Sequence, residues 1–474
     1  MNCCEESGPG GRREFLGRTG LGLGLLGLRS LLAEEDGRGL QAAVPVGGGL
    51  NPLALRPPHA AATAKRVIHI FLNGGPSHVD TFDHKPLLKR YIGRTLPVPN
   101  LQTESPTEFS FPSPFTFRRY GESGIEVSDL FRHVGESIDD ICVIRSMYAD
   151  VPNHEPSLML LNCGTANQFR PSMGAWLTYG LGSECQDLPG FIAMCPGGYP
   201  IKGTDNWRSA FLPGIFQGTH VDPAGRDPRR LIDFTRNSRL DRGGQRRLLD
   251  LLRAMNSRHR SQRTSDPRLE ARVQSFEQAF RMQTAAADAF DVSDEPRHIQ
   301  EMYGEGVQSR QLLIARRLSE RGVRFVQVWH GEGQPWDSHA NIRREHKRLA
   351  GQCSQAIGAL LKDLKQRGLL EETLVLWGGE FGRTPTAQDG TGRDHNHHGF
   401  TVWLAGGGVR GGTVYGATDE LGWKAAKNPV HVHDLQATML HLMGLDHERL
   451  TYRYAGRDFR LTDVGGRVIP EIIA

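Results

Sequence analysis

Carboxylate and imidazole side chains gather in the C-terminal third of the chain, in the segments WDSH, GGEFGR and RDHNHHG. These are the side chains with which proteins bind divalent metal ions through oxygen and nitrogen. Three of the four residues from 395 to 398 are histidines, a density that an ordinary solvated loop does not need. The segments therefore indicate a metal site that draws on Asp337, His339, Glu380, Asp394, His395, His397 and His398.

The mixture of imidazoles and carboxylates also favours one class of metal. Calcium is bound by oxygen ligands, whereas imidazole suits zinc and other transition metals. We therefore expect zinc or another transition metal rather than calcium. Adjacent residues of an extended loop point to opposite sides, so His397 and His398 should not both reach one ion. We expect about two of the three histidines at 395, 397 and 398 to do so.

Short apolar runs alternate with amphipathic segments along the chain, and these elements must position the site. The apolar runs predict buried strands at residues 66–72, 142–147, 323–329 and 373–377. The amphipathic segments predict helices at residues 155–164, 308–321, 345–367 and 431–443. Apolar strands separated by helices are typical of a mostly parallel sheet with helices on both faces. We therefore predict an α/β fold.

Residues with chemically useful side chains follow four of the expected strands. In open α/β sheets, binding and catalytic sites lie at the carboxyl ends of the strands. We therefore expect one shared site that includes Asn73, His154, Asp337 and Glu380.

The chain is expected to consist of a leader and one large domain. Residues 1–43 are interpreted as a signal and leader, residues 44–65 as a flexible linker, and residues 66–474 as the α/β domain. Within that domain, the charge-rich helical stretch at about 224–305 is interpreted as an insertion. Such helices usually present a solvated face. The sequence leaves open whether the insertion forms a lid over the site.

The N-terminus has the features of an export signal. Arg12 and Arg13 are followed by Phe15 and Leu16 and by a Gly/Leu-rich apolar stretch at 21–32, the pattern of a twin-arginine signal. That stretch is too short for a stable spanning helix, and no other run reaches ~18 consecutive apolar residues. We therefore expect the twin-arginine export machinery as a partner, a periplasmic or cell-surface location, and no stable membrane insertion.

Charge and cysteine content argue against two other classes of site. The net charge is only +4 and the basic residues do not gather on one helix face, which argues against nucleic-acid binding. The seven cysteines form no CxxC pair, which argues against a cysteine-based zinc site. Cys163, Cys185 and Cys195 are close enough in sequence that one disulfide could form among them in an oxidising compartment, and their odd number leaves at least one free thiol.

Six separated motifs carry a resemblance to a known family. The chain resembles domain-of-unknown-function family 1501, a family of exported bacterial proteins of planctomycete type within the alkaline phosphatase/sulfatase-like superfamily. The resemblance runs from about residue 68 to the end and implies an alkaline phosphatase/sulfatase-like fold. The motifs are FLNGGPSHVDTFDHKP (71–86), NHEPSLMLLNCG (153–164), RPSMGAWLTYGLGSE (170–184), WDSHAN (336–341), TLVLWGGEFGRTP (373–385) and DHNHHGFTVWLAGGGVRGG (394–412).

The resemblance places His154 where sulfatases carry their nucleophile. In sulfatases that position opens a Cys-x-Pro-Ser-Arg motif whose cysteine becomes formylglycine, whereas this chain has His154-Glu155-Pro156-Ser157-Leu158. An imidazole can bind metal or act as a base or nucleophile, but it cannot become formylglycine. A formylglycine sulfatase is therefore excluded, and His154 remains the candidate catalytic residue.

The resemblance also shifts the expected metal ligands at two positions. Asn73 stands where the superfamily has its first metal-binding aspartate, so Asp80, helped by His78, is expected to supply the missing carboxylate. Glu380 followed by Phe381 replaces an Asp-His pair, which keeps a carboxylate and loses an imidazole.

Several of these residues also have purely structural interpretations. Asp337 and His339 could cap the helix that follows them, since aspartate is a good cap. Arg383 could hold an anionic substrate through a bidentate fork or could pair with Glu380. Asn73 and Gly74 could present amides to a substrate or could only form a turn.

Structural interpretations also exist for residues at the starts of two helices. His154 could be a buried, hydrogen-bonded core histidine, and Ser157 is expected to support the turn of its helix. His431 and His433, at the start of the C-terminal helix, are expected to be structural.

Together, these observations indicate an exported metal-dependent hydrolase of anionic esters. The expected substrate is a phosphate or sulfate ester, on a small molecule or on a polysaccharide, with Arg383 holding the anion. The alternative is a non-catalytic periplasmic or surface protein that keeps the fold and binds metal or glycan without turnover. The replaced nucleophile and Asn73 favour the alternative, and the density of histidines and acids favours the hydrolase.

Overall fold

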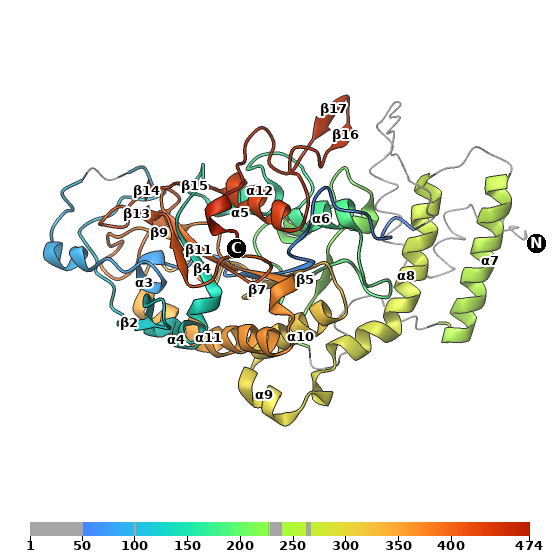
Figure 1. Cartoon of the computed structure of the whole chain (residues 1–474), viewed down its shortest axis with the longest axis horizontal. Helices are drawn as coiled ribbons and strands as arrows, with labels where there is room; N and C mark the ends of the chain where they lie inside the picture. The colour runs from blue at the N-terminus through green and yellow to red at the C-terminus, as the bar shows by residue number, and fades with distance from the viewer. Residues whose placement is uncertain (1–50, 99–100, 226, 228–238, 262–266) are drawn as a thin grey trace, which may run out of the picture.

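The computed structural model describes residues 51–98, 101–225, 227, 239–261 and 267–474 (Figure 1). The predicted signal and leader at 1–43 and the first residues of the linker lie outside these ranges.

A nine-stranded sheet forms the centre of the molecule. Eight strands follow the order β12-β4-β11-β8-β1-β7-β5-β6, and β15 pairs with β4. All neighbours along this order pair in parallel except β11, which runs antiparallel to β4 and β8. The prediction of a mostly parallel α/β sheet is therefore confirmed. The strands are β1 (Arg66–Phe71), β4 (Ile141–Tyr148), β5 (Phe191–Met194), β6 (Thr219–Val221), β7 (Phe325–Trp329), β8 (Thr373–Gly378), β11 (Phe400–Ala405), β12 (Thr413–Tyr415) and β15 (Val430–His431).

Helices cover both faces of this sheet (Figure 1). One face carries α5 (His154–Cys163), α6 (Met173–Leu181) and α12 (Val432–Leu442), and the other carries α4 (Arg132–Gly135), α10 (Val307–Glu320) and α11 (Ile342–Gln366). The position of strand β1 explains why its sequence is almost entirely apolar. Ile68 and Ile70 pack into one hydrophobic cluster, and Val67 and Phe71 pack into the cluster on the opposite face. A strand that is buried on both faces cannot alternate between polar and apolar residues.

The segments that follow β1, β4, β7 and β8 emerge at one edge of the sheet. Strands β1, β7 and β8 are parallel neighbours. Strand β11 is antiparallel to both β4 and β8, so β4 runs in the same direction as β8. This common direction brings the residues after all four strands together, although they are far apart in the sequence.

The helical insertion does not cover this edge. It contains α7 (Arg242–Ser261) and α8 (Pro267–Phe290), which lie at the opposite end of the long axis from β9 (Gly382–Arg383) (Figure 1). Helix α8 is attached to the core where Gln278 Nε2 donates to the carbonyl of Leu188, at 3.0 Å. Helices α7 and α8, which make up most of the described insertion, are therefore not a lid over the residues that follow the strands.

The disulfide that the cysteine spacing allowed is absent from the described part of the chain. All five described cysteines are free, and Cys163 and Cys195 are buried. Cys163 ends α5, where its Sγ lies 3.6 Å from the carbonyl oxygen of Asp205. Burial raises the pKa of both thiols above their usual range. Among the described residues, no helix is long and apolar enough to cross a membrane.

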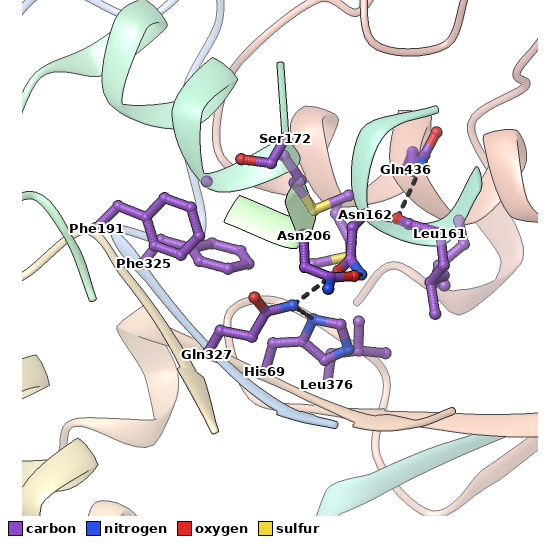
Figure 2. A pocket seen from close by; sticks show the side chains of 14 residues that line it. His69, Leu161, Asn162, Ser172, Phe191, Asn206, Phe325, Gln327, Leu376 and Gln436 are labelled. Carbon is purple, nitrogen blue, oxygen red and sulfur yellow. Dashed lines mark hydrogen bonds between the residues drawn. The ribbon is translucent and has the colours of Figure 1, made fainter. Parts of the chain in front are cut away.

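A small cavity lined by polar and apolar side chains lies between the sheet and the layer formed by α5, α6 and α12 (Figure 2). Gln327 Nε2 donates to Asn162 Oδ1 at 2.8 Å, and Asn162 Nδ2 donates to Asn206 Oδ1 at 3.1 Å. His69 also lines the cavity, and burial lowers its pKa to about 3. None of the predicted site residues lines this cavity, so we interpret it as a core feature.

Candidate metal centre

Three histidines surround one carboxylate oxygen at the edge where the strands end. His339 Nε2 lies 2.8 Å from Asp337 Oδ1, His395 Nε2 lies 3.3 Å from it, and His154 Nε2 lies 3.4 Å from it. His154 is the first residue of α5, Asp337 and His339 belong to the loop after β7, and His395 begins β10 (His395–Asn396). The structure therefore brings together four of the residues that the sequence predicted.

The other ring nitrogen of each histidine is held by an oxygen atom. His154 Nδ1 lies 2.6 Å from Glu380 Oε1, and His339 Nδ1 lies 2.6 Å from Gln388 Oε1. His395 Nδ1 lies 2.8 Å from the carbonyl oxygen of Pro152. Because each acceptor favours a proton on Nδ1, each neutral ring directs an Nε2 lone pair toward Asp337. This is the arrangement in which histidines bind metal ions, with the second nitrogen donating to a carboxylate or carbonyl.

The charges in the cluster are strongly coupled. Burial raises the pKa of Asp337, but its contacts with His154, His339, His395 and Arg383 outweigh burial and lower that pKa far below its usual range. Burial lowers the pKa of His154, but its contacts with Asp337 and Glu380 raise it to about 9. Without a metal ion, protons therefore compensate the carboxylates of this cluster.

Glycine at position 74 allows two loops to approach closely. Gly74 has φ +108°, and a Cβ there would lie 2.5 Å from the backbone nitrogen of Asp337. Its amide donates to Glu380 Oε1 at 2.9 Å. Asn73 Nδ2 donates to the carbonyls of Gly331, at 2.9 Å, and Gly333, at 2.6 Å. Asn73 and Gly74 thus fasten the loop that carries Asp337, whereas the sequence interpretation placed them against a substrate.

Arg383 is buried beside the cluster and holds Asp337 in place. Its side chain is 0% exposed, and its Nε donates to the carbonyl of Gly75 at 2.9 Å. Its Nη2 donates to Asp337 Oδ1 at 2.6 Å and to the carbonyl of Gly74. These bonds correct both interpretations of the sequence. Arg383 does not pair with Glu380, and its guanidinium group is not free to bind an anion through two parallel hydrogen bonds.

Asp80 and His78 do not join the cluster. Asp80 Oδ2 accepts hydrogen bonds from Arg393 Nε at 2.8 Å and from Ser77 Oγ at 2.6 Å. His78 Nε2 lies 2.9 Å from the carbonyl oxygen of Gly422. The short helix α3 (His78–Thr81) turns the carboxylate toward Arg393, so the expected replacement ligand is engaged in a buried ion pair.

Only one of the three histidines between 395 and 398 reaches the cluster. His398 Nε2 lies 2.8 Å from the carbonyl oxygen of Gln102, and the rings of His397 and His398 are tilted against each other with centroids 3.9 Å apart. Burial lowers the pKa of His397 to about 4. The structure therefore does not bring His397 and His398 to the centre.

The structure also decides the remaining structural alternatives. Asn341 is the N-cap residue of α11, so neither Asp337 nor His339 caps that helix. His431 Nδ1 accepts from the backbone nitrogen of His433 in a capping box, so the structural role predicted for the start of α12 is confirmed. Ser157 Oγ donates to the carbonyl of Val151, away from the cluster.

Sequence reasoning missed several residues that contact the centre. Glu104 Oε2 lies 2.6 Å from His395 Nδ1, and its Oε1 accepts from Asn153 Nδ2 at 3.1 Å. The next residue, Ser105, donates its amide to Asp394 Oδ2 at 2.7 Å. Glu104, Ser105 and Gln388 lie in irregular loops without a recognisable motif. We therefore find no sequence signal that would have identified them.

The donor atoms fit a transition metal ion. His154, Asp337 and His395 form one group with mutually close ligand atoms, and His339, Asp394 and His395 form another. His154 Nε2, Glu380 Oε2 and Asp394 Oδ1 are buried without a hydrogen-bond partner, and buried polar atoms are normally satisfied. Imidazole nitrogens combined with carboxylate oxygens suit zinc or a related ion.

Comparison with solved structures finds distant likenesses. The PsFucS1 sulfatase from Pseudoalteromonas sp. matches at 11% identity and a TM-score of 0.34, over 90% of this chain and 72% of that chain. A phosphonate monoester hydrolase from Silicibacter pomeroyi matches at 11% identity and a TM-score of 0.32, over 66% and 68%. The alkaline phosphatase from the Antarctic bacterium TAB5 matches at 9% identity and a TM-score of 0.34, over 81% and 99%.

Comparison with curated proteins finds no match. A family model described as "Protein of unknown function (DUF1501)" matches residues 64–473, as the motifs of the sequence predicted, and the chain belongs to this family.

Proposed function

We propose that the protein is a metal-dependent hydrolase that cleaves an ester bond at the Asp337 cluster. The observation that carries this proposal is the common orientation of three imidazoles. His154, His339 and His395 each have Nδ1 held by an oxygen and Nε2 directed at one carboxylate oxygen. Three imidazoles and a carboxylate are a donor set typical of zinc enzymes.

The residues of the chain have separable roles in this proposal. His154, His339 and His395 would hold the ion through Nε2, together with Asp337. When bound, a divalent ion would supply Lewis acidity to water and to the ester group. Glu380 and Gln388 hold protons on the Nδ1 atoms and fix the planes of two rings.

Water is the nucleophile that best suits this centre. None of the hydrogen bonds found in the described residues joins a hydroxyl or thiol side chain to His154, His339, His395 or Asp337. Direct attack by water therefore agrees with the side chains present better than a covalent intermediate on serine, threonine or cysteine.

Metal analysis of the purified full-length protein tests this proposal. We expect about one equivalent of a transition metal in the wild type and much less in His154→Ala and in Asp337→Ala, since each variant removes one ligand. His298→Ala is a matched control, because His298 is exposed on α9 (Arg297–Tyr303). Protein that binds no metal would contradict the proposal. Metal-loaded protein that cleaves no ester would support the non-catalytic binding protein instead.

We also propose export by the twin-arginine route, on the basis of Arg12, Arg13 and the apolar stretch at 21–32. Fusion of residues 1–65 to a fluorescent reporter tests the route. The fusion should reach the periplasm, and the same fusion with Arg12→Lys and Arg13→Lys should stay in the cytoplasm. Export of both fusions would contradict this proposal.

A further inference from the structure

An exposed tyrosine lies beside the loop that carries Asp337. Strand β5 pairs in parallel with β7, so the segments that follow these two strands leave the sheet at the same edge. Tyr199 follows β5, and its carbonyl accepts a hydrogen bond from the amide of Gly333 at 2.9 Å. Gly333 precedes Asp337 by four residues, a length of chain that spans at most about 14 Å. Tyr199 therefore borders the candidate metal centre.

Two other rings hold the side chain of Tyr199 in a fixed orientation. Its ring stacks on that of His220, with centroids 4.4 Å apart and planes 27° from parallel. Trp207 is buried, and its ring stacks on the same histidine at 5.7 Å and 4°. His220 Nε2 lies 3.1 Å from the carbonyl oxygen of Gly198, which fixes the middle ring. The three rings are thus anchored in the core at Trp207, whereas Tyr199 remains 45% exposed.

The surroundings of this ring are polar. In residues 195–218 and 330–341, all of which the structure describes, Tyr199 is the only exposed large hydrophobic residue. Glu332 is exposed on the loop after β7, and its carboxylate packs against Gly198, where a Cβ would lie 3.0 Å from Oε1. A single aromatic ring lacks the broad apolar area that a lipid surface or a hydrophobic protein partner requires. The structure instead combines one aromatic ring with a nearby hydrogen-bond acceptor.

A sugar ring has the two properties that such a surface can recognise. One face of a pyranose ring presents C–H groups that stack on an aromatic ring, and its hydroxyl groups donate hydrogen bonds to a carboxylate. We propose that Tyr199 and Glu332 form a saccharide-binding subsite beside the candidate metal centre, so that the ester cleaved there is carried by a carbohydrate. The statement about the ester rests on the proposed hydrolase function.

The subsite is separate from the groups that would bind metal. Neither Tyr199 nor Glu332 belongs to the two groups of candidate ligands. The subsite therefore does not depend on the number or the charge of the bound ions. An oligosaccharide with one ring on Tyr199 can extend along the loop after β7 and present an ester group to the centre.

Saccharide binding by the metal-loaded, full-length protein tests the subsite directly. The probes are cellohexaose, xylohexaose, mannohexaose and chitohexaose, and saturation-transfer NMR reports which sugar protons contact the protein. We expect at least one probe to bind through its ring C–H protons. Titration calorimetry should give about tenfold weaker binding of that probe in Tyr199→Ala. Tyr199→Trp should keep the wild-type affinity, because it keeps an aromatic ring at this position.

Another exposed tyrosine provides the matched control. Tyr454 is 41% exposed, and its ring stacks on that of Phe211. It belongs to the hairpin of β16 (Tyr452–Tyr454) and β17 (Arg457–Phe459), which stands apart from β9 in Figure 1. Tyr454→Ala should bind the probe as the wild type does, whereas Glu332→Gln should bind it about threefold more weakly. Binding of none of the four probes, or equal affinities in the wild type and Tyr199→Ala, would overturn the inference.

Cleavage of esters without a sugar separates this inference from the function on which it rests. The metal-loaded protein is given 4-nitrophenyl acetate, 4-nitrophenyl phosphate and 4-nitrophenyl sulfate, and then the acetylated, phosphorylated and sulfated forms of the probe that binds. Metal-dependent cleavage of a nitrophenyl ester without binding of any hexasaccharide would overturn the inference and leave the hydrolase proposal standing. Saccharide binding that depends on Tyr199, without cleavage of any of these esters, would support the subsite and contradict the hydrolase proposal.

Discussion

Two carboxylates of this protein, the partly exposed Asp337 and the buried Asp80, were both expected to bind metal and have opposite surroundings. Asp337 faces three imidazole nitrogens, with Arg383 at its edge. Asp80 and Arg393 are both 0% exposed and form a direct ion pair. Burial raises the pKa of Asp80, but the charge and hydrogen bonds of Arg393 outweigh it and lower that pKa. Imidazoles can exchange a proton for a metal ion at neutral pH, whereas a guanidinium cannot lose its proton and has no lone pair to offer.

This difference shows what makes an acidic residue a metal ligand. Carboxylate chemistry is common to both sites, so it does not distinguish them. The partner residue determines whether the carboxylate can bind a metal ion, because Arg393 permanently compensates the negative charge of Asp80. The imidazoles around Asp337 compensate its negative charge only while they carry an additional proton.

Removal of the Asp80 carboxylate should have the largest effect on stability. Asp80→Ala leaves Arg393 buried without its counterion, and we expect a loss of about 3–5 kcal/mol in the free energy of unfolding, measured by urea denaturation. The metal content of the folded fraction should stay at the wild-type value. The double variant Asp80→Leu/Arg393→Met should recover much of the loss, since it removes both charges. Loss of metal in folded Asp80→Ala would show that the two carboxylates are not separate.

The stability of the metal-free protein should depend on pH through His154. The folded-state pKa is raised to about 9, above the unfolded value of about 6.5. Protonation of His154 therefore stabilises the fold fully below about pH 6.5, and this stabilisation is lost as pH rises toward 9. We expect a decrease of about 3 kcal/mol over that range, measured by denaturation at several pH values in the presence of a chelator. His154→Ala should remove most of this slope, and an unchanged slope would contradict the assignment to His154.

Glu380 should affect the affinity for metal more than the number of ions bound. Its Oε1 contacts His154 Nδ1, which is the position of a residue that orients a ligand. We expect Glu380→Gln to bind about one equivalent of metal with about 10–100-fold lower affinity, measured by competition with a chelator. Glu371→Gln, an exposed residue just before β8, is the control and should keep the wild-type affinity. Complete loss of metal in Glu380→Gln would make Glu380 a direct ligand.

The smallest effect is expected at His398. This residue adjoins the cluster in sequence, but its ring contacts the carbonyl of Gln102. We expect His398→Ala to retain the full metal content and to change the free energy of unfolding by less than about 1 kcal/mol. His395→Ala is the matched comparison three positions earlier and should lose the metal. Equal losses in the two variants would show that both histidines reach the ion.

The main elements could be predicted because their cause is local. The run from Val67 to Phe71 is apolar at nearly every position, and its burial on both faces follows from a parallel sheet between two helical layers. The same order of strands and helices predicted that Asp337 and Glu380 would follow strand ends at one edge. The possible disulfide among Cys163, Cys185 and Cys195 does not form, because spacing in sequence does not measure the distance between thiols in space.

The sequence by itself determined which elements form, their order, and which segments carry groups able to bind a metal. The motifs also determined the family. Only the tertiary structure decided which of those groups meet. It placed His395 rather than His397 or His398 at the centre, paired Asp80 with Arg393, committed Arg383 to Asp337, and brought Glu104 to His395. The physical reason is that periodicity and motifs report local conformation, whereas a binding site depends on distances between atoms that are hundreds of residues apart in the chain.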